Sequence, residues 1–199
     1  MLSSVPALLP LSLLEAVQNI DTPADDGLGA LQDELASKRL GLSPTVAAQV
    51  ARYRQRAVDG ETVAADEVLA VFRLVGRRPD AALVYADAGR RAARYAAKEI
   101  GPGVKGMLAM APGKRTKLAI GLRAASKLSQ RWLLADLQPA DGLARCELLD
   151  SLPMQAREDG VACAFYTAAL AELLRLVAGV EGAMVHRSCR GRGDRSCVW

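Results

Sequence analysis

Three of the four cysteines and the only histidine of this chain lie within its last 37 residues. They are Cys163, His186, Cys189 and Cys197, with the histidine three residues before the second cysteine of the group. Three thiolates and one imidazole form a complete tetrahedral ligand set for zinc, and a set closed by four protein ligands is typical of a structural ion. The pattern therefore predicts a structural zinc site and no open metal position for catalysis.

The elements around these residues have to bring them together. Apolar residues at helical spacing predict a helix over Val161–Val177 with Cys163 in its first turn. Glycines between Cys189 and Cys197 predict a tight turn, flanked by strands at Glu181–Ser188 and Arg195–Trp199. The alternative is that these cysteines are small buried hydrophobic residues and that the histidine is a satisfied core or surface residue.

Upstream, the same apolar periodicity indicates a helix-rich chain. Helices are expected at Leu9–Val17, Thr45–Ala57, Thr62–Gly76, Pro79–Ile100, Val104–Ala111 and Lys114–Leu134, with a linker at Asp21–Gly29. A turn at Gln138–Gly142 precedes a strand at Leu143–Leu149, and Met154–Glu158 is its expected hairpin partner. We therefore predict an α+β fold, an antiparallel sheet packed with helices, with a helical N-terminal extension at 1–78 and the ligand-binding domain at 79–199.

Composition limits the functional classes. Four cysteines in 199 residues are too few for a disulfide scaffold, and the N-terminus lacks the pattern of a signal peptide. The apolar stretch Leu8–Val17 is too short to span a bilayer, so we expect a cytoplasmic protein without a transmembrane segment. Residues 1–37 hold six acidic and no basic residues, which leaves 26 basic and 16 acidic residues in the remainder. This basic surplus permits binding to nucleic acid or to anionic lipid. The sequence contains no nucleic-acid-binding motif, however, so we do not expect nucleic acid as a partner.

The order of cysteine, apolar helix, glycine, short strand, ligand-x-x-Cys, turn and final cysteine resembles the 4-vinyl reductase domain, also called the hydrocarbon-binding domain. The bacteriochlorophyll-pathway branch is the most similar, by hydrophobic order from Phe72 to Trp132, including Leu74-Val75-Gly76 and Leu108–Pro112. In that family the position of His186 is usually glutamate, so this chain keeps a ligand there but changes its chemistry.

The resemblance implies a protein that binds a hydrophobic small molecule, such as a tetrapyrrole of the protochlorophyllide type. Arg187 and Arg190, beside the zinc turn, are candidates to pair with its carboxylates. Trp132, Leu128 and Ala125, on one helical stripe with Gly121, are candidates for an apolar cavity wall. Tight helix packing is the alternative for that stripe, and charge balance or exposure to solvent is the alternative for the arginines.

No Gly-rich nicotinamide fingerprint follows a predicted strand, so we do not expect a reductase that acts alone. Two other functions stay open beside the tetrapyrrole carrier: a sensory domain for a small aromatic ligand, and an adaptor similar to the small subunits of vesicle-tethering complexes. A homodimer and a pathway enzyme are the expected partners. The chain ends two residues after Cys197, earlier than is usual for a last strand, which points to a truncated C-terminus.

Overall fold

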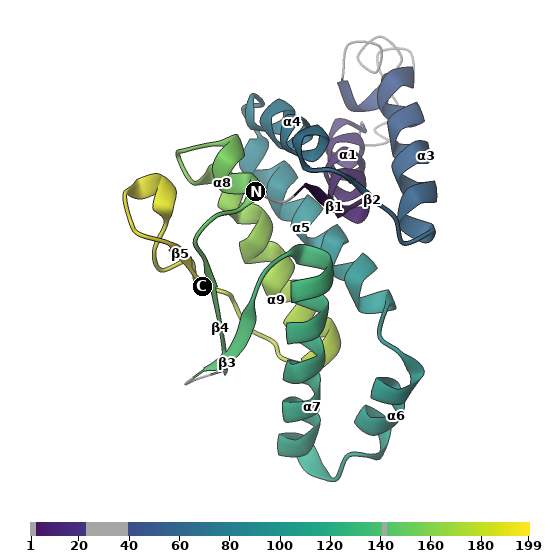
Figure 1. Ribbon diagram of the computed structural model, residues 1–199, viewed down its shortest axis with the longest axis vertical. Helices are drawn as coiled ribbons and strands as arrows, with labels where there is room; N and C mark the ends of the chain where they lie inside the picture. The colour runs from purple at the N-terminus through teal and green to yellow at the C-terminus, as the bar shows by residue number, and fades with distance from the viewer. Residues whose placement is uncertain (1–2, 23–39, 141–142) are drawn as a thin grey trace, which may run out of the picture.

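The structure is a computed structural model that describes residues 3–22, 40–140 and 143–199. Two small antiparallel sheets pack against the helices, so the predicted α+β class is confirmed (Figure 1). In chain order the elements of the first half are β1 (Ser4–Pro6), α1 (Leu8–Asp21), the 3-10 turn η1 (Leu40–Leu42), α3 (Pro44–Val58), β2 (Thr62–Ala64), α4 (Ala65–Gly76) and α5 (Ala81–Lys98). Next come α6 (Pro102–Met110), α7 (Gly113–Leu128), the π-helical turn η2 (Ser129–Leu133), β3 (Leu137–Ala140), β4 (Leu143–Leu148), α8 (Leu152–Ala156), η3 (Val161–Cys163), α9 (Ala164–Ala178), η4 (Arg190–Arg192) and β5 (Cys197–Val198).

Helices α5 and α9 form the centre of the core. They approach closely because α5 presents small residues to α9, and a Cβ atom added at Gly89 would lie 2.1 Å from the carbonyl oxygen of Phe165. Phe165 in turn packs edge-on against Phe72 of α4, with ring centroids 5.5 Å apart. Gly179 stops helix α9 after Ala178, as expected, in the left-handed conformation that glycine adopts without strain.

The N-terminal helix α1 is buried in the same core. It packs against α5, α3 and α4, and its apolar residues belong to one continuous cluster with those of α5 and α9. One of its two buried acids, Glu15, accepts hydrogen bonds from Arg54 and Tyr95. The expected boundary near residue 79 falls between α4 and α5, and apolar residues on both sides of it share this core.

The C-terminal sheet has the order β3-β4-β5, all antiparallel. The predicted hairpin partner of β4 was wrong: Met154 lies in helix α8, and β3 takes that place in the segment expected as a turn. Pro153 explains the error, because proline in the first turn favours a helix start. The strand expected at Glu181–Ser188 is reduced to a single bridge between Ser188 and Val198.

Two helix boundaries also differ from expectation. Residues 62–64 are strand β2, which pairs with β1, so α4 starts at Ala65. Helix α7 ends at Leu128 and continues as the π-helical turn η2. Asp21 is the last residue of α1, and residues 23–29 of the expected linker lie outside the described residues.

Among the described residues one segment, 161–178, is long and apolar enough to cross a membrane. More than half of it is buried inside the protein, and α9 packs there against α5 and α7. Core helices pass the same test of length and composition, so this stretch is accounted for by its packing.

Candidate metal centre and neighbouring pockets

Cys163 is fixed at the start of α9. Gly160, at a φ of 77°, turns the chain before η3, and the Cys163 amide donates to the Gly160 carbonyl at 3.0 Å. The side chain of Cys163 is buried and faces the C-terminal loop, where its Sγ lies 3.7 Å from Cys197 Sγ. The helix start therefore supplies the first ligand, as the sequence predicts.

The loop between Cys189 and Cys197 is closed by Asp194. Its carboxylate accepts from the Cys189 amide at 2.6 Å, and its own amide donates back to the Cys189 carbonyl at 3.2 Å. Gly193, at a φ of 98°, permits the turn, and the Arg190 amide points at Cys197 Sγ at 3.4 Å. Asp194 was not identified from the sequence, although an aspartate in a Gly-rich turn is a known signal for such a local bond.

The four candidate ligands converge on one point. Their ligand atoms all lie within 4.8 Å of one another, and Cys197 Sγ is 3.9 Å from Cys189 Sγ. Thiolates bound tetrahedrally to zinc at about 2.3 Å lie about 3.8 Å apart, so the sulfur spacing already matches a bound ion. Cys163, His186, Cys189 and Cys197 are thus close enough to hold a metal ion.

His186 is positioned by an aromatic stack and not by a strand. Its ring lies on that of Trp199, with centroids 4.4 Å apart and an interplanar angle of 8°. The indole of Trp199 is itself fixed by a 2.8 Å hydrogen bond to Thr167 of α9. His186 Nε2 is buried and has no hydrogen-bond partner among the described residues, which leaves its lone pair available to a metal. Burial, followed by the nearby Arg192, lowers the pKa of His186 and favours the neutral ring that metals bind.

The thiols of Cys163 and Cys197 need a metal to ionise. Burial raises the pKa of Cys163 and of Cys197 above the ordinary value of a thiol, so without an ion both are protonated at neutral pH. A bound cation reverses this, because the ligand is the thiolate and binding releases the proton. Cys146 is outside the cluster: it is buried on β4, where burial raises its pKa to about 12.

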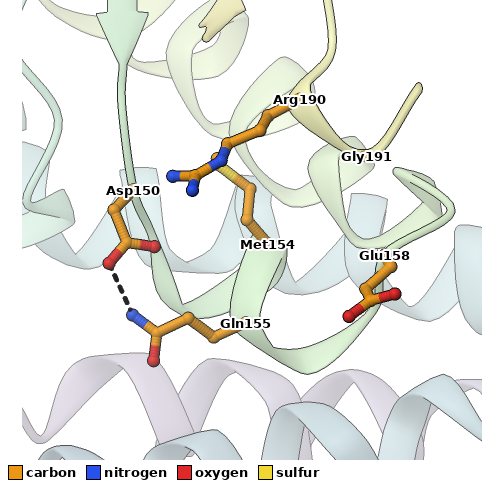
Figure 2. Close-up of a pocket in the computed structure, with 6 residues that line it drawn as sticks. All are labelled: Asp150, Met154, Gln155, Glu158, Arg190 and Gly191. Atoms are coloured by element: carbon orange, nitrogen blue, oxygen red, sulfur yellow. Dashed lines mark hydrogen bonds between the residues drawn. The ribbon is translucent and has the colours of Figure 1, made fainter. Parts of the chain in front are cut away.

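The residues expected to bind a small molecule do not meet in one cavity. Arg187 lines a pocket of about 220 Å³ together with Trp199, Met184 and Leu174. Arg190 lies along a polar pocket of about 410 Å³, where its guanidinium donates to the Leu149 carbonyl at 2.5 Å. Figure 2 shows this pocket, including the hydrogen bond from Gln155 to Asp150.

The predicted stripe on α7 has two different roles. Ala125 and Leu128 are buried and line none of the pockets found along the described chain. At Gly121 an added Cβ would lie 2.5 Å from the Cα of Ala178, so this part of the stripe packs tightly on α9. Of the three candidates, only Trp132 lines a pocket found along the described chain, of about 260 Å³.

The Trp132 pocket is built on irregular backbone. Trp132 stands in the π-helical turn η2, which ends at Leu134 in the left-handed conformation with a φ of 57°. Leu134 is the only residue other than glycine with a positive φ among those described, and such strain clusters at functional sites. Trp132 is only 8% exposed, and its Nε1–H has no hydrogen-bond partner among the described residues.

The remaining walls of this pocket come from three helices. Leu8 and Leu11 of α1 and Ala57 of α3 are apolar, and Tyr95 of α5 adds a second aromatic ring. Lys98 also lines the pocket, with its Nζ 5.3 Å from the Tyr95 ring centroid. The pocket is thus lined by apolar and aromatic side chains, by the cations of Arg54 and Lys98 and by the carboxylate of Glu99.

Comparison with protein-family models, with curated proteins and with solved structures finds no match for this chain.

Proposed function

We propose that this chain is a small-molecule-binding protein whose Cys3His centre holds a structural zinc ion and whose ligand binds in the Trp132 pocket. The observation that carries the proposal is the buried indole N–H of Trp132 without an acceptor. Buried donors are almost always paired in folded proteins, so an unpaired indole N–H on a residue that lines a pocket supports a ligand that supplies the acceptor. The resemblance to the hydrocarbon-binding domain supports the same class of function.

Zinc is the ion that this ligand set favours. Three thiolates and one imidazole suit a borderline-soft divalent ion, and the sulfur spacing of 3.7 and 3.9 Å agrees with tetrahedral zinc. Four protein ligands leave no position for water or substrate, so the ion would act by fixing the loop of residues 189–197 to the start of α9. The substitution of histidine for the glutamate typical of the family keeps the set complete.

The chemistry of the pocket selects an aromatic or hydrocarbon ligand with an acceptor group. Tyr95 and Trp132 contribute aromatic rings to the wall, the leucines of α1 offer apolar contact, and Lys98 offers charge to a carboxylate. Arg54 and Glu99 also line the pocket, and the Arg54 guanidinium is held by Glu15 at 2.7 Å, so Lys98 is the cation for a ligand. A ligand bound here would need no metal contact, because the zinc centre lies elsewhere.

The resemblance points to a tetrapyrrole intermediate of bacteriochlorophyll synthesis as the ligand, delivered to a pathway enzyme. A pocket of about 260 Å³ is smaller than the sites that enclose drug-sized molecules, so a tetrapyrrole would insert one edge and leave the rest outside. That geometry suits a carrier that presents its ligand to a second protein. The same volume favours a second candidate, a sensory domain that encloses one small aromatic molecule.

Titration of the zinc-loaded protein with a magnesium porphyrin of the protochlorophyllide type, and separately with phenol and benzoate, separates these candidates. The matched variants are Trp132→Phe, which keeps an aromatic ring without the N–H, and Arg187→Gln and Arg190→Gln in the other pockets. We expect a saturable shift of the Soret band and a Kd that rises about 5- to 15-fold in Trp132→Phe alone, as loss of one hydrogen bond predicts.

Binding of only the small aromatics, with the same dependence on Trp132, would move the proposal to the sensory function. The assignment of the ligand to the Trp132 pocket would be contradicted if any of these ligands bound wild type and Trp132→Phe equally but bound Arg187→Gln more weakly. Metal analysis of the same samples checks the zinc separately, at one ion per chain.

A further inference from the structure

Helix α6 and the start of α7 form a hairpin that extends from the core, here called the α6–α7 hairpin (residues 101–117). Its turn lies at one end of the molecule's longest axis (Figure 1). No residue of α6 is buried, and the methionines Met107 and Met110 are 53% and 85% exposed. Exposed apolar side chains on a projecting helix gain nothing from the core, so they are available to an external surface.

The charge of this region has one sign. Residues 100–135 contain seven lysines and arginines and no aspartate or glutamate. Lys105, Lys114, Arg115 and Lys117 belong to the hairpin, are all exposed, and form no ion pair with any carboxylate of the described residues. The hairpin therefore carries four exposed cations together with the exposed methionines, and none of these cations is paired with a carboxylate of the described residues.

We propose that the α6–α7 hairpin docks on an anionic lipid surface. Met107 and Met110 would enter the boundary between headgroups and acyl chains, while the surrounding lysines and arginine contact lipid phosphates. The proposal does not rest on the ligand of the Trp132 pocket or on the zinc ion. It assigns a membrane-surface location to a chain whose described core is packed as a globular protein.

Two other occupants fit this surface less well. Nucleic acid would use the cations, but residues 101–131 contain no phenylalanine, tyrosine or tryptophan on which bases stack, and the methionines would stay in water. A second copy placed hairpin to hairpin would bring together two surfaces of equal charge, which opposes association. An anionic bilayer offers phosphate groups to the lysines and arginine of the hairpin and an apolar layer to its methionines.

Co-sedimentation of the full chain with vesicles of phosphatidylcholine and phosphatidylglycerol at 70:30, against vesicles of phosphatidylcholine alone, tests the proposal. We expect binding only to the anionic vesicles and a steep decrease with added NaCl. Lys114→Gln/Arg115→Gln should weaken partitioning about 30-fold, at roughly fivefold for each charge near the surface. The matched control is Arg73→Gln/Arg77→Gln, which removes two exposed cations from the α4 end of the molecule and should bind as wild type does.

The apolar contribution has its own pair of variants. Met110→Ser should weaken binding to the anionic vesicles by about tenfold, as expected when much of a methionine side chain leaves hydrocarbon. Leu83→Ser removes a comparably exposed apolar residue, at 66% exposure on α5, and should have no effect. Because the altered side chains are exposed, all four variants should melt as wild type does.

Several outcomes would overturn the proposal. Equal binding to neutral vesicles, or an equal loss in both charge variants, would leave the hairpin without a specific role. Light scattering that finds a dimer dissociated by Met110→Ser would identify a second copy as the occupant. Binding to a DNA or RNA duplex without binding to vesicles would identify nucleic acid.

Discussion

Replacing Cys163 with serine should abolish the dependence of stability on zinc. The side chain is 1% exposed, and its sulfur lies 3.7 Å from that of Cys197, so no other described cysteine or histidine can take its place without moving α9. Serine is nearly isosteric but is a poor zinc ligand, so the substitution removes one of four bonds and changes little else. The stabilisation that zinc gives the wild-type chain is then lost.

The size of the expected change in Tm follows from the coupling of zinc binding to folding. Zinc present at 1,000 times its Kd stabilises a folded chain that binds it by about 4 kcal/mol. In a chain of this size, 1 kcal/mol corresponds to about 2–4 °C in Tm, so removing zinc from wild type should lower Tm by about 8–16 °C. Cys163→Ser should melt at the low temperature with or without zinc.

Thermal melts followed by circular dichroism, with added zinc and with a chelator, measure both quantities. Cys146→Ser is the matched control, because Cys146 is equally buried but lies outside the cluster. Burying a hydroxyl there should cost about 1–3 kcal/mol while leaving the response to zinc intact. A full zinc response in Cys163→Ser, or its loss in Cys146→Ser, would refute the ligand assignment.

Two further perturbations test the core and its charges. Gly89→Ala should destabilise the fold by about 1–3 kcal/mol or more in urea unfolding, since the new Cβ would meet the Phe165 carbonyl oxygen at 2.1 Å. Ion pairs with Arg175 and Arg94 hold the pKa of Glu172 at about 2, below its ordinary 4.5. The paired carboxylate therefore contributes stability that is complete above pH 4.5 and is lost as the pH falls toward 2. Because both arginines are about half exposed, Glu172→Gln should cost only about 1 kcal/mol at pH 7, and the difference from wild type should vanish near pH 2.

Matched controls accompany these two variants. Gly182→Ala adds the same methyl group where nothing lies within 4 Å, and it should leave the urea midpoint unchanged. Glu181→Gln removes a nearby exposed carboxylate and should leave the stability at pH 7 unchanged. A Gly89→Ala protein as stable as wild type would contradict the close approach of α5 and α9.

The metal cluster could be predicted because cysteine and histidine are rare residues with few roles. Four of them in one short segment, with a helix start and a Gly-rich turn between them, restrict the geometry strongly, and the four ligand atoms do converge. The main helices could be predicted for a related reason, since long apolar periodicity persists whatever the helix packs against. Their ends were less certain, because η2 and β2 are decided by contacts and not by local sequence.

The short strands could not be predicted. Residues 4–6 pair with residues 62–64, and so short a segment carries no period to detect. The segment before Ser188 has the sequence pattern of a strand but lies mostly outside the sheet. It is held by a hydrogen bond from the Arg187 amide to the Val198 carbonyl at 2.8 Å and by the stack of His186 on Trp199. The residues predicted to bind a small molecule lie in different places for a similar reason. Helical spacing predicts Trp132 and Ala125 on one stripe, but Trp132 lies in the π-helical turn η2, which changes the spacing, and it lines a pocket that Ala125 does not reach.

The burial of α1 has a consequence for synthesis on the ribosome. This helix is apolar on nearly every side, yet its main partner α5 begins at Ala81, 60 residues after α1 ends at Asp21. At about 5–20 residues per second, the nascent helix waits roughly 3–12 s before that partner emerges. During this interval α1 offers an unprotected apolar surface, which makes the growing chain a natural client for chaperones that bind at the ribosomal exit.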